Sequence, residues 1–110
     1  MKGTSLVSEE GLHYSDLSAE AKEHALKSFI DYYTKQYRRD SLEILGAKVS
    51  NGAMGTINEI LNLNKFMDHS SLAAGSYCLS KSAYVEIMEQ LIDVLYHEDG
   101  EPVVDWDVAW

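Results

Sequence analysis

The sequence predicts an α+β fold that is mainly helical, with three or more helices and a small antiparallel sheet that includes the C-terminal strand. Two stretches, 18–38 and 81–97, place apolar residues at the spacing of one helical face. The last residues of the chain instead place them at every second position, as a half-buried strand does. With 110 residues, 45% of them hydrophobic, we expect a single domain over 1–110, in which residues 1–13 are flexible.

The first predicted helix covers residues 18–38. Ser18 is suited to cap its N-terminus, because a serine hydroxyl at this position accepts a hydrogen bond from a backbone N–H of the first turn. Acid-to-base pairs four residues apart stabilise such a helix, and two occur on its polar side: Glu23 with Lys27 and Asp31 with Lys35.

The middle of the chain has less regular patterns. Residues 41–45 suit a short helix that ends at Gly46, and the glycines at 52 and 55 predict a loop before a helix capped by Thr56 that runs to about residue 66 or 67. Ser70, Ser71 and Gly75 bracket what could be a single helical turn. The short apolar stretch 77–79 fits either a strand or a buried connector.

The last helix is predicted over residues 81–97, with Ser80 or Ser82 as its cap. Gly100 and Pro102 follow and are suited to stop it. In the predicted strand beyond them, one face carries Val104, Trp106, Val108 and Trp110, and the other carries Val103, Asp105, Asp107 and Ala109. The tryptophan face either covers the core or forms an exposed edge that pairs with another chain; the partner strands within this chain would be 12–14 or 77–79.

Charge is unevenly distributed along the chain. The net charge is −9, and residues 82–110 contain eight acids but no lysine or arginine. The negative electrostatic field of such an acidic segment repels phosphates and attracts basic surfaces, which disfavours direct nucleic-acid binding. Alternatively, the acids could serve solubility alone. If the acids bind a partner, we expect the interface at Glu86, Glu89, Asp93, Glu98, Asp99, Glu101, Asp105 and Asp107, with an aromatic anchor at Tyr84, Tyr96 or a tryptophan.

Few residues suggest chemistry. No glycine-rich phosphate loop is present, and Cys78, which lacks a histidine or aspartate at a catalytic spacing, is expected to be a small buried hydrophobe. The alternative to an interaction protein is a small metal-dependent enzyme or regulator that uses Asp93, His97 and Asp99. We expect no cofactor. The basic cluster of Lys35, Arg38 and Arg39 is interpreted as a solvated helix end.

The sequence has no apolar run long enough for a membrane span, and its single cysteine cannot form an internal disulfide. We therefore expect a cytoplasmic protein with no membrane partner.

Two stretches resemble parts of a group of small phage and prophage accessory proteins. The segment YSDLSAEAKEHA, residues 14–25, resembles an opening in which an aromatic residue, an acid, Leu-Ser and Glu-Ala-Lys lead into the first helix. The segment YHEDGE, residues 96–101, is similar to the closing part of that group. The resemblance implies an accessory protein that acts on a host or competitor macromolecule, for example an anti-CRISPR or other anti-defence protein. It would be a non-enzymatic inhibitor that docks its acidic surface on a basic, nucleic-acid-binding groove of a host or defence-system protein; a homodimer is a further expectation.

Overall fold

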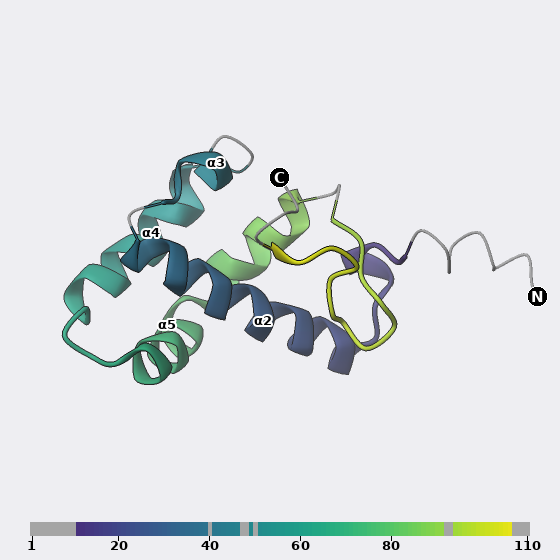
Figure 1. Cartoon of the computed structure of the whole chain (residues 1–110), viewed down its shortest axis with the longest axis horizontal. Helices are drawn as coiled ribbons and strands as arrows, with labels where there is room; N and C mark the ends of the chain where they lie inside the picture. Colours follow the sequence, from purple (N-terminus) through teal and green to yellow (C-terminus); the bar gives the residue numbers. More distant parts are fainter. Residues whose placement is uncertain (1–10, 40, 47–48, 50, 92–93, 107–110) are drawn as a thin grey trace, which may run out of the picture.

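The computed structural model describes residues 11–39, 41–46, 49, 51–91 and 94–106 of the chain. Three long helices dominate these residues and pack into one compact domain, which confirms the mainly helical part of the predicted fold (Figure 1). A 3-10 turn and a short helix complete the order of elements: η1 (Tyr14–Asp16), α2 (Ala19–Arg38), α3 (Glu43–Gly46), α4 (Asn51–Leu63) and α5 (His69–Gln90).

The predicted first helix is confirmed as α2. Ser18 caps it, since its hydroxyl accepts a hydrogen bond from the backbone N–H of Ala21 at 3.1 Å. Both i,i+4 ion pairs form on the exposed side, with N···O distances of 4.0 Å for Lys27–Glu23 and 3.3 Å for Lys35–Asp31. The apolar side of α2 is buried and provides the centre of the core.

The predicted loop before Thr56 is wrong, because α4 begins at Asn51 and includes both glycines. Thr56 lies inside the helix, where its hydroxyl donates to the carbonyl of Gly52 at 3.2 Å, four residues earlier. The buried residues Ala53, Ile57 and Leu61 follow one another at intervals of four, so the core contact maintains the helix in spite of its glycines. The short helix ending at Gly46 is confirmed as α3.

Residues 69–90 form one long helix in place of the predicted turn, connector and separate helix. Asp68 caps α5 by accepting a hydrogen bond from the Ser71 N–H at 2.8 Å, and residues 77–79 are helical. The helix bends at Ser80, whose dihedral angles, φ −129° and ψ 22°, are not helical, so the predicted helix start coincides with a kink. The helix ends at Gln90, well before the predicted end at 97.

The residues after α5 form a tight turn, and the described part of the predicted C-terminal strand is not a strand. Leu12 and Tyr96 exchange two backbone hydrogen bonds of 2.8 Å, and Tyr96 also pairs with Pro102, both in antiparallel fashion and both as isolated bridges. The pairing candidate at 12–14 is thus found in a minimal form. No strand occurs among the residues that the structure describes, and 107–110, half of the predicted strand, lie outside them.

The expected alternation of side chains also fails before residue 107. Val103 and Val104 are both partly exposed, at 40% and 49%, whereas Trp106 is buried. The Trp106 ring packs edge-to-face against Phe29 of α2, with ring centroids 5.1 Å apart, and its indole N–H donates to the Ser28 hydroxyl at 2.9 Å. The interpretation of Trp106 as a residue that closes the core is therefore confirmed.

Helix α5 packs against both α2 and α4. The hydroxyl of Tyr33 on α2 donates to the side-chain oxygen of Asn58 on α4 at 2.8 Å, and the ring of Tyr33 meets that of Tyr84 on α5 at right angles, 5.5 Å between centroids. Burial raises the pKa of Tyr33, and it raises the pKa of Tyr84 to about 12, so both phenols stay protonated over the ordinary pH range.

The two ends of α2 have different neighbours. Residues 94–106 lie beside its N-terminal half, while the connection between α4 and α5 lies at its C-terminal end (Figure 1). None of the helices described is long and apolar enough to cross a membrane.

Candidate functional site

The predicted interface residues that the structure describes are exposed carboxylates. Two of them lie on the last turns of α5 and four on the segment that follows: Glu86, Glu89, Glu98, Asp99, Glu101 and Asp105. These six form what we call the acidic surface. Asp93 and Asp107, which belong to the same prediction, lie outside the described residues.

The lysines of α2 and α5 make their ion pairs with other acids. Lys27 and Lys81 approach Glu23, and Lys35 approaches Asp31. Within the described residues, no lysine or arginine lies within ion-pair distance of Glu89, Glu98, Asp99, Glu101 or Asp105; the cation paired with Glu101 is His24. These five carboxylates of the acidic surface are therefore not neutralised by the lysines and arginines of the described residues.

A close backbone contact holds the turn of the acidic surface against α2. The N–H of His97 bonds to the carbonyl of Glu101 at 2.8 Å, which leaves Glu98, Asp99 and Gly100 as a three-residue turn. Gly100 has φ 96°, a left-handed value that favours glycine, and a Cβ there would lie 2.1 Å from the carbonyl oxygen of Ala21. Gly100 thus shapes a turn on α2, and the prediction that it ends a helix is wrong.

The side chains within this turn differ in how freely they could meet a partner. The Asp99 carboxylate accepts a hydrogen bond of 2.9 Å from the Glu101 backbone N–H, and Glu101 pairs with His24. The sequence could not show these internal contacts. Glu98 and Asp105 have no such contact among the described residues, so they are the most available members of the acidic surface.

The predicted aromatic anchors that the structure describes are not exposed, and Trp110 lies outside the described residues. Tyr96 and Tyr84 are fully buried and Trp106 nearly so. The Tyr96 ring lies between Tyr14 and Trp106, with centroids 6.2 Å and 6.0 Å away, and burial raises the pKa of its hydroxyl. The Tyr96 side chain thus belongs to the core and not to the surface, and a role for it in partner binding stays a sequence prediction. The exposed apolar residues beside the acids are Val103 and Val104.

The metal-binding alternative gains no support from the described residues. His97 is exposed, and one oxygen of Asp99 is already engaged by the turn. No group of three or more histidine, cysteine or carboxylate side chains is placed to hold a metal ion in the described part of the chain, and Asp93 lies outside it. The metal-dependent role therefore stays a sequence prediction.

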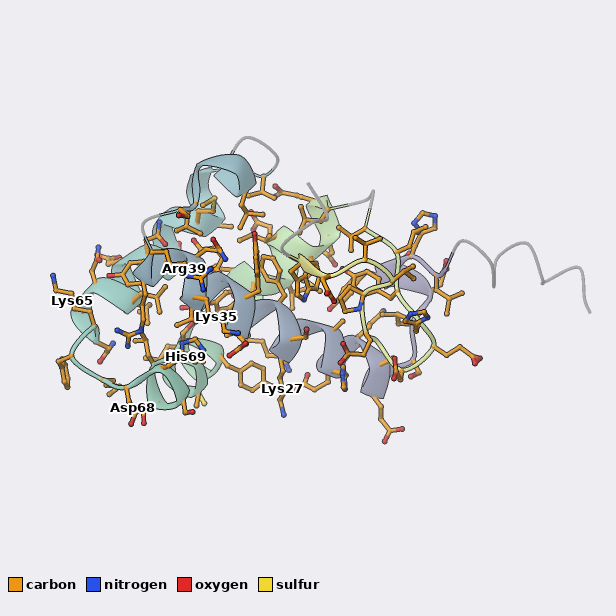
Figure 2. The ribbon with its side chains drawn as sticks, in the orientation of Figure 1. Lys27, Lys35, Arg39, Lys65, Asp68 and His69 are labelled. Carbon is orange, nitrogen blue, oxygen red and sulfur yellow. The ribbon has the colours of Figure 1, made fainter. Side chains whose placement is uncertain are left out.

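An open pocket that the sequence did not indicate lies between α2 and the first half of α5. Its volume is about 420 Å³, and Ile30, Ala73 and Ala74 are among its apolar lining residues. At its rim, His69 Nε2 lies 2.6 Å from an oxygen of Asp31, which also pairs with Lys35. Figure 2 labels His69 on α5 and Lys35 on α2. Burial acts to raise the pKa of Asp31, but the hydrogen bonds from His69 and Lys35 outweigh it and lower that pKa.

Cys78 also lines this pocket and is exposed, so its prediction as a buried hydrophobe is wrong. Nine helical positions separate it from His69 on α5, which corresponds to about 13 Å along the helix axis. A thiol and an imidazole at that separation cannot share a proton, so the pair does not form a nucleophile and base. His69 and Asp31 are better explained as a link between α5 and α2.

Comparisons with protein-family models, with curated proteins and with solved structures found no match to this chain.

Proposed function

We propose that the protein is a non-enzymatic interaction module that docks its acidic surface on a basic surface of a partner protein. The observation that carries the proposal is the exposure of five carboxylates at the end of α5 and in the segment that follows it, none of which lies within ion-pair distance of a lysine or arginine among the described residues: Glu89, Glu98, Asp99, Glu101 and Asp105. Carboxylates left without cations in this way create a negative potential that a positively charged surface would complement.

The proposed partner is a host or defence-system protein whose basic groove normally holds nucleic acid. A cluster of exposed carboxylates can replace phosphates in such a groove, and the same field disfavours binding to nucleic acid itself. The likeness of residues 14–25 and 96–101 to phage accessory proteins supports the narrower proposal of an inhibitor of a CRISPR-Cas-type complex in the host cytoplasm.

A matched pair of charge reversals tests the docking. Glu98→Lys changes the acidic surface, whereas Glu59→Lys makes the same change in net charge at an exposed position on α4. In bacteria whose CRISPR-Cas complex targets a plasmid, the wild-type chain and the Glu59→Lys variant should restore plasmid transformation. The Glu98→Lys variant should restore it at least tenfold less, since reversing a charge in a complementary interface weakens binding by more than about 1.4 kcal/mol.

Binding to the purified effector complex gives the second measurement. Electrostatic docking predicts an affinity that falls as salt rises, because exposed charges are screened. An affinity that is the same at low and high salt, or an equal loss of inhibition in both lysine variants, would count against docking through the acidic surface. The absence of inhibition against every complex tested would remove the anti-CRISPR assignment.

A further inference from the structure

A second pocket, which includes one member of the acidic surface, lies where η1 packs against the end of α5. Its volume is about 330 Å³. Its apolar wall consists of Met88, Leu91 and Val94, all of which belong to the buried core. Pockets that enclose whole small-molecule ligands measure about 300–1,000 Å³, so a pocket at the lower limit suits a group of side-chain size.

One carboxylate and no lysine or arginine is found among the described residues that line this pocket. Glu89, which is exposed, supplies the carboxylate. In the described part of the chain, no lysine or arginine lies within ion-pair distance of Glu89. His13 also lines the pocket and is exposed, and it carries a charge only when its imidazole is protonated. We use the name Glu89 pocket for the site lined by Tyr14, Met88, Glu89, Leu91 and Val94.

The hydroxyl of Tyr14 indicates the sign of the electrostatic field at the Glu89 pocket. Burial raises the pKa of Tyr14, and the carboxylates of Glu89 and Glu23 raise it further, while the ammonium of Lys81 lowers it by less. Lys81 lies 3.3 Å from an oxygen of Glu23, so this cation is already paired. Lys22 lies over the Tyr14 ring but does not line the pocket. The negative charges therefore outweigh the positive ones at the Tyr14 hydroxyl, which favours a cation beside it.

An arginine side chain has both of the properties that this pocket requires. Its aliphatic stem is apolar, and its guanidinium can donate two parallel hydrogen bonds to one carboxylate. The guanidinium is also more weakly hydrated than the ammonium of lysine, so its transfer from water to a partly apolar site costs less. Arginines are common in grooves that hold nucleic acid, where they contact phosphates.

We propose that the Glu89 pocket receives an arginine side chain of the partner protein, with the guanidinium on the Glu89 carboxylate and the stem against Met88 and Leu91. The inference rests on the proposed function, because the arginine belongs to the basic groove on which the acidic surface docks. It also changes the nature of the expected anchor. The described aromatic candidates are buried in the core, and the anchoring side chain comes instead from the partner and enters a pocket of this chain.

Two tripeptides blocked at both ends test the pocket without the partner protein. One has arginine between two glycines, and the other has citrulline, which is similar in shape but uncharged. The methyl signals of Met88, Leu91 and Val94 are followed by NMR at a pH of about 8, where histidine side chains are ordinarily neutral. The arginine peptide should shift these signals and reach saturation at up to tens of millimolar, because one side chain supplies only part of an interface affinity. The citrulline peptide should bind more weakly by about fivefold or more.

Two matched variants show whether the Glu89 carboxylate holds the arginine. Glu89→Gln keeps the shape of an exposed side chain, and it should weaken binding of the arginine peptide by about fivefold or more. Glu59→Gln removes the same charge from an exposed position on α4 and should bind the peptide as the wild type does. Any of three results would overturn the inference: no saturable shift in the wild type, equal binding of the arginine and citrulline peptides, or equal binding by Glu89→Gln and the wild type. A lysine peptide that binds more tightly than the arginine peptide would overturn the choice of arginine.

The effector complex separates failure of this inference from failure of the proposed function. Glu89→Gln should inhibit the complex less than Glu59→Gln does. If Glu98→Lys abolishes inhibition while Glu89→Gln leaves it intact, docking through the acidic surface stands and the arginine pocket is overturned. If the wild-type chain inhibits no complex but binds the arginine peptide through Glu89, the proposed function fails and the pocket is supported as a site for a guanidinium group.

Discussion

Two glycines with different environments show how much one residue controls in this structure. Gly100 has a positive φ, which is strained for a residue with a side chain, and a methyl group added there would clash with the Ala21 carbonyl. Gly75, inside α5, has no atom within 4 Å of the position of a Cβ. The sequence marks both simply as glycine, and only the backbone around them separates a required residue from a replaceable one.

We therefore expect opposite effects from the same substitution at these two positions. Gly100→Ala should lower the free energy of unfolding by more than about 2 kcal/mol, since left-handed backbone alone costs about 1–2 kcal/mol and the clash adds to it. Gly75→Ala should raise it by about 0.5–1 kcal/mol through helix propensity. Urea unfolding of the two variants beside the wild type measures both. A Gly100→Ala protein as stable as the wild type would show that the turn does not lie against α2 as described.

Residue type also limited what could be predicted of the candidate site. The carboxylates of residues 82–110 were predicted to be charged surface, and those described are exposed, because removing an ionised carboxylate from water is costly. Tyr96 was expected at the surface and is buried, whereas Cys78 was expected to be buried and is exposed. An amphipathic ring or a thiol is stable in either environment, and the fold decides which one it occupies.

At the scale of elements, prediction succeeded where several local signals agreed. For α2, the cap at Ser18, the ion pairs and the apolar spacing all point to one helix, and all are found. In α4 and α5, the glycines and serines indicated breaks, but burial of one face against the neighbouring helices outweighs their low helix propensity. The kink at Ser80 explains why the apolar pattern of α5 seemed to start there.

The contact between His69 and Asp31 joins two of these helices, and it should depend on pH. The pKa of Asp31 is lowered in the folded protein, so its stabilising effect is complete above the unfolded value of about 3.9 and is lost as pH falls through the folded value. The wild type should therefore be more stable than Asp31→Asn at neutral pH, and this difference should disappear as pH drops below about 4.

Thermal unfolding of both proteins across that pH range measures the effect, which should be small because Asp31 is half exposed. Replacing His69 by Gln supplies a double-mutant cycle. If the two groups interact, the loss in the Asp31→Asn, His69→Gln protein will be smaller than the sum of the single losses. Additive losses, or a difference that persists at low pH, would show that the pair does not couple the helices.

At the scale of the whole molecule, α2 is the element that unites the fold. Its apolar side chains belong to one buried cluster with residues of α4, α5 and the C-terminal segment. The C-terminal segment adds Trp106, which packs on Phe29 and bonds to Ser28, so the turn of the acidic surface is attached to the same core as the helices. A domain with one core is expected to unfold in one step.

Trp106 provides the means to test this. Trp110→Phe leaves Trp106 as the remaining tryptophan of the two in the chain, so fluorescence then reports the C-terminal segment while far-ultraviolet circular dichroism reports the helices. We expect the two urea transitions to coincide. Trp106→Ala should lower the free energy of unfolding by about 3–5 kcal/mol, as for other buried aromatic residues, because Phe29 then loses a face of its packing. A fluorescence transition at lower urea than the loss of helix would mean that the segment detaches first. The acidic surface would then not be held rigidly on α2.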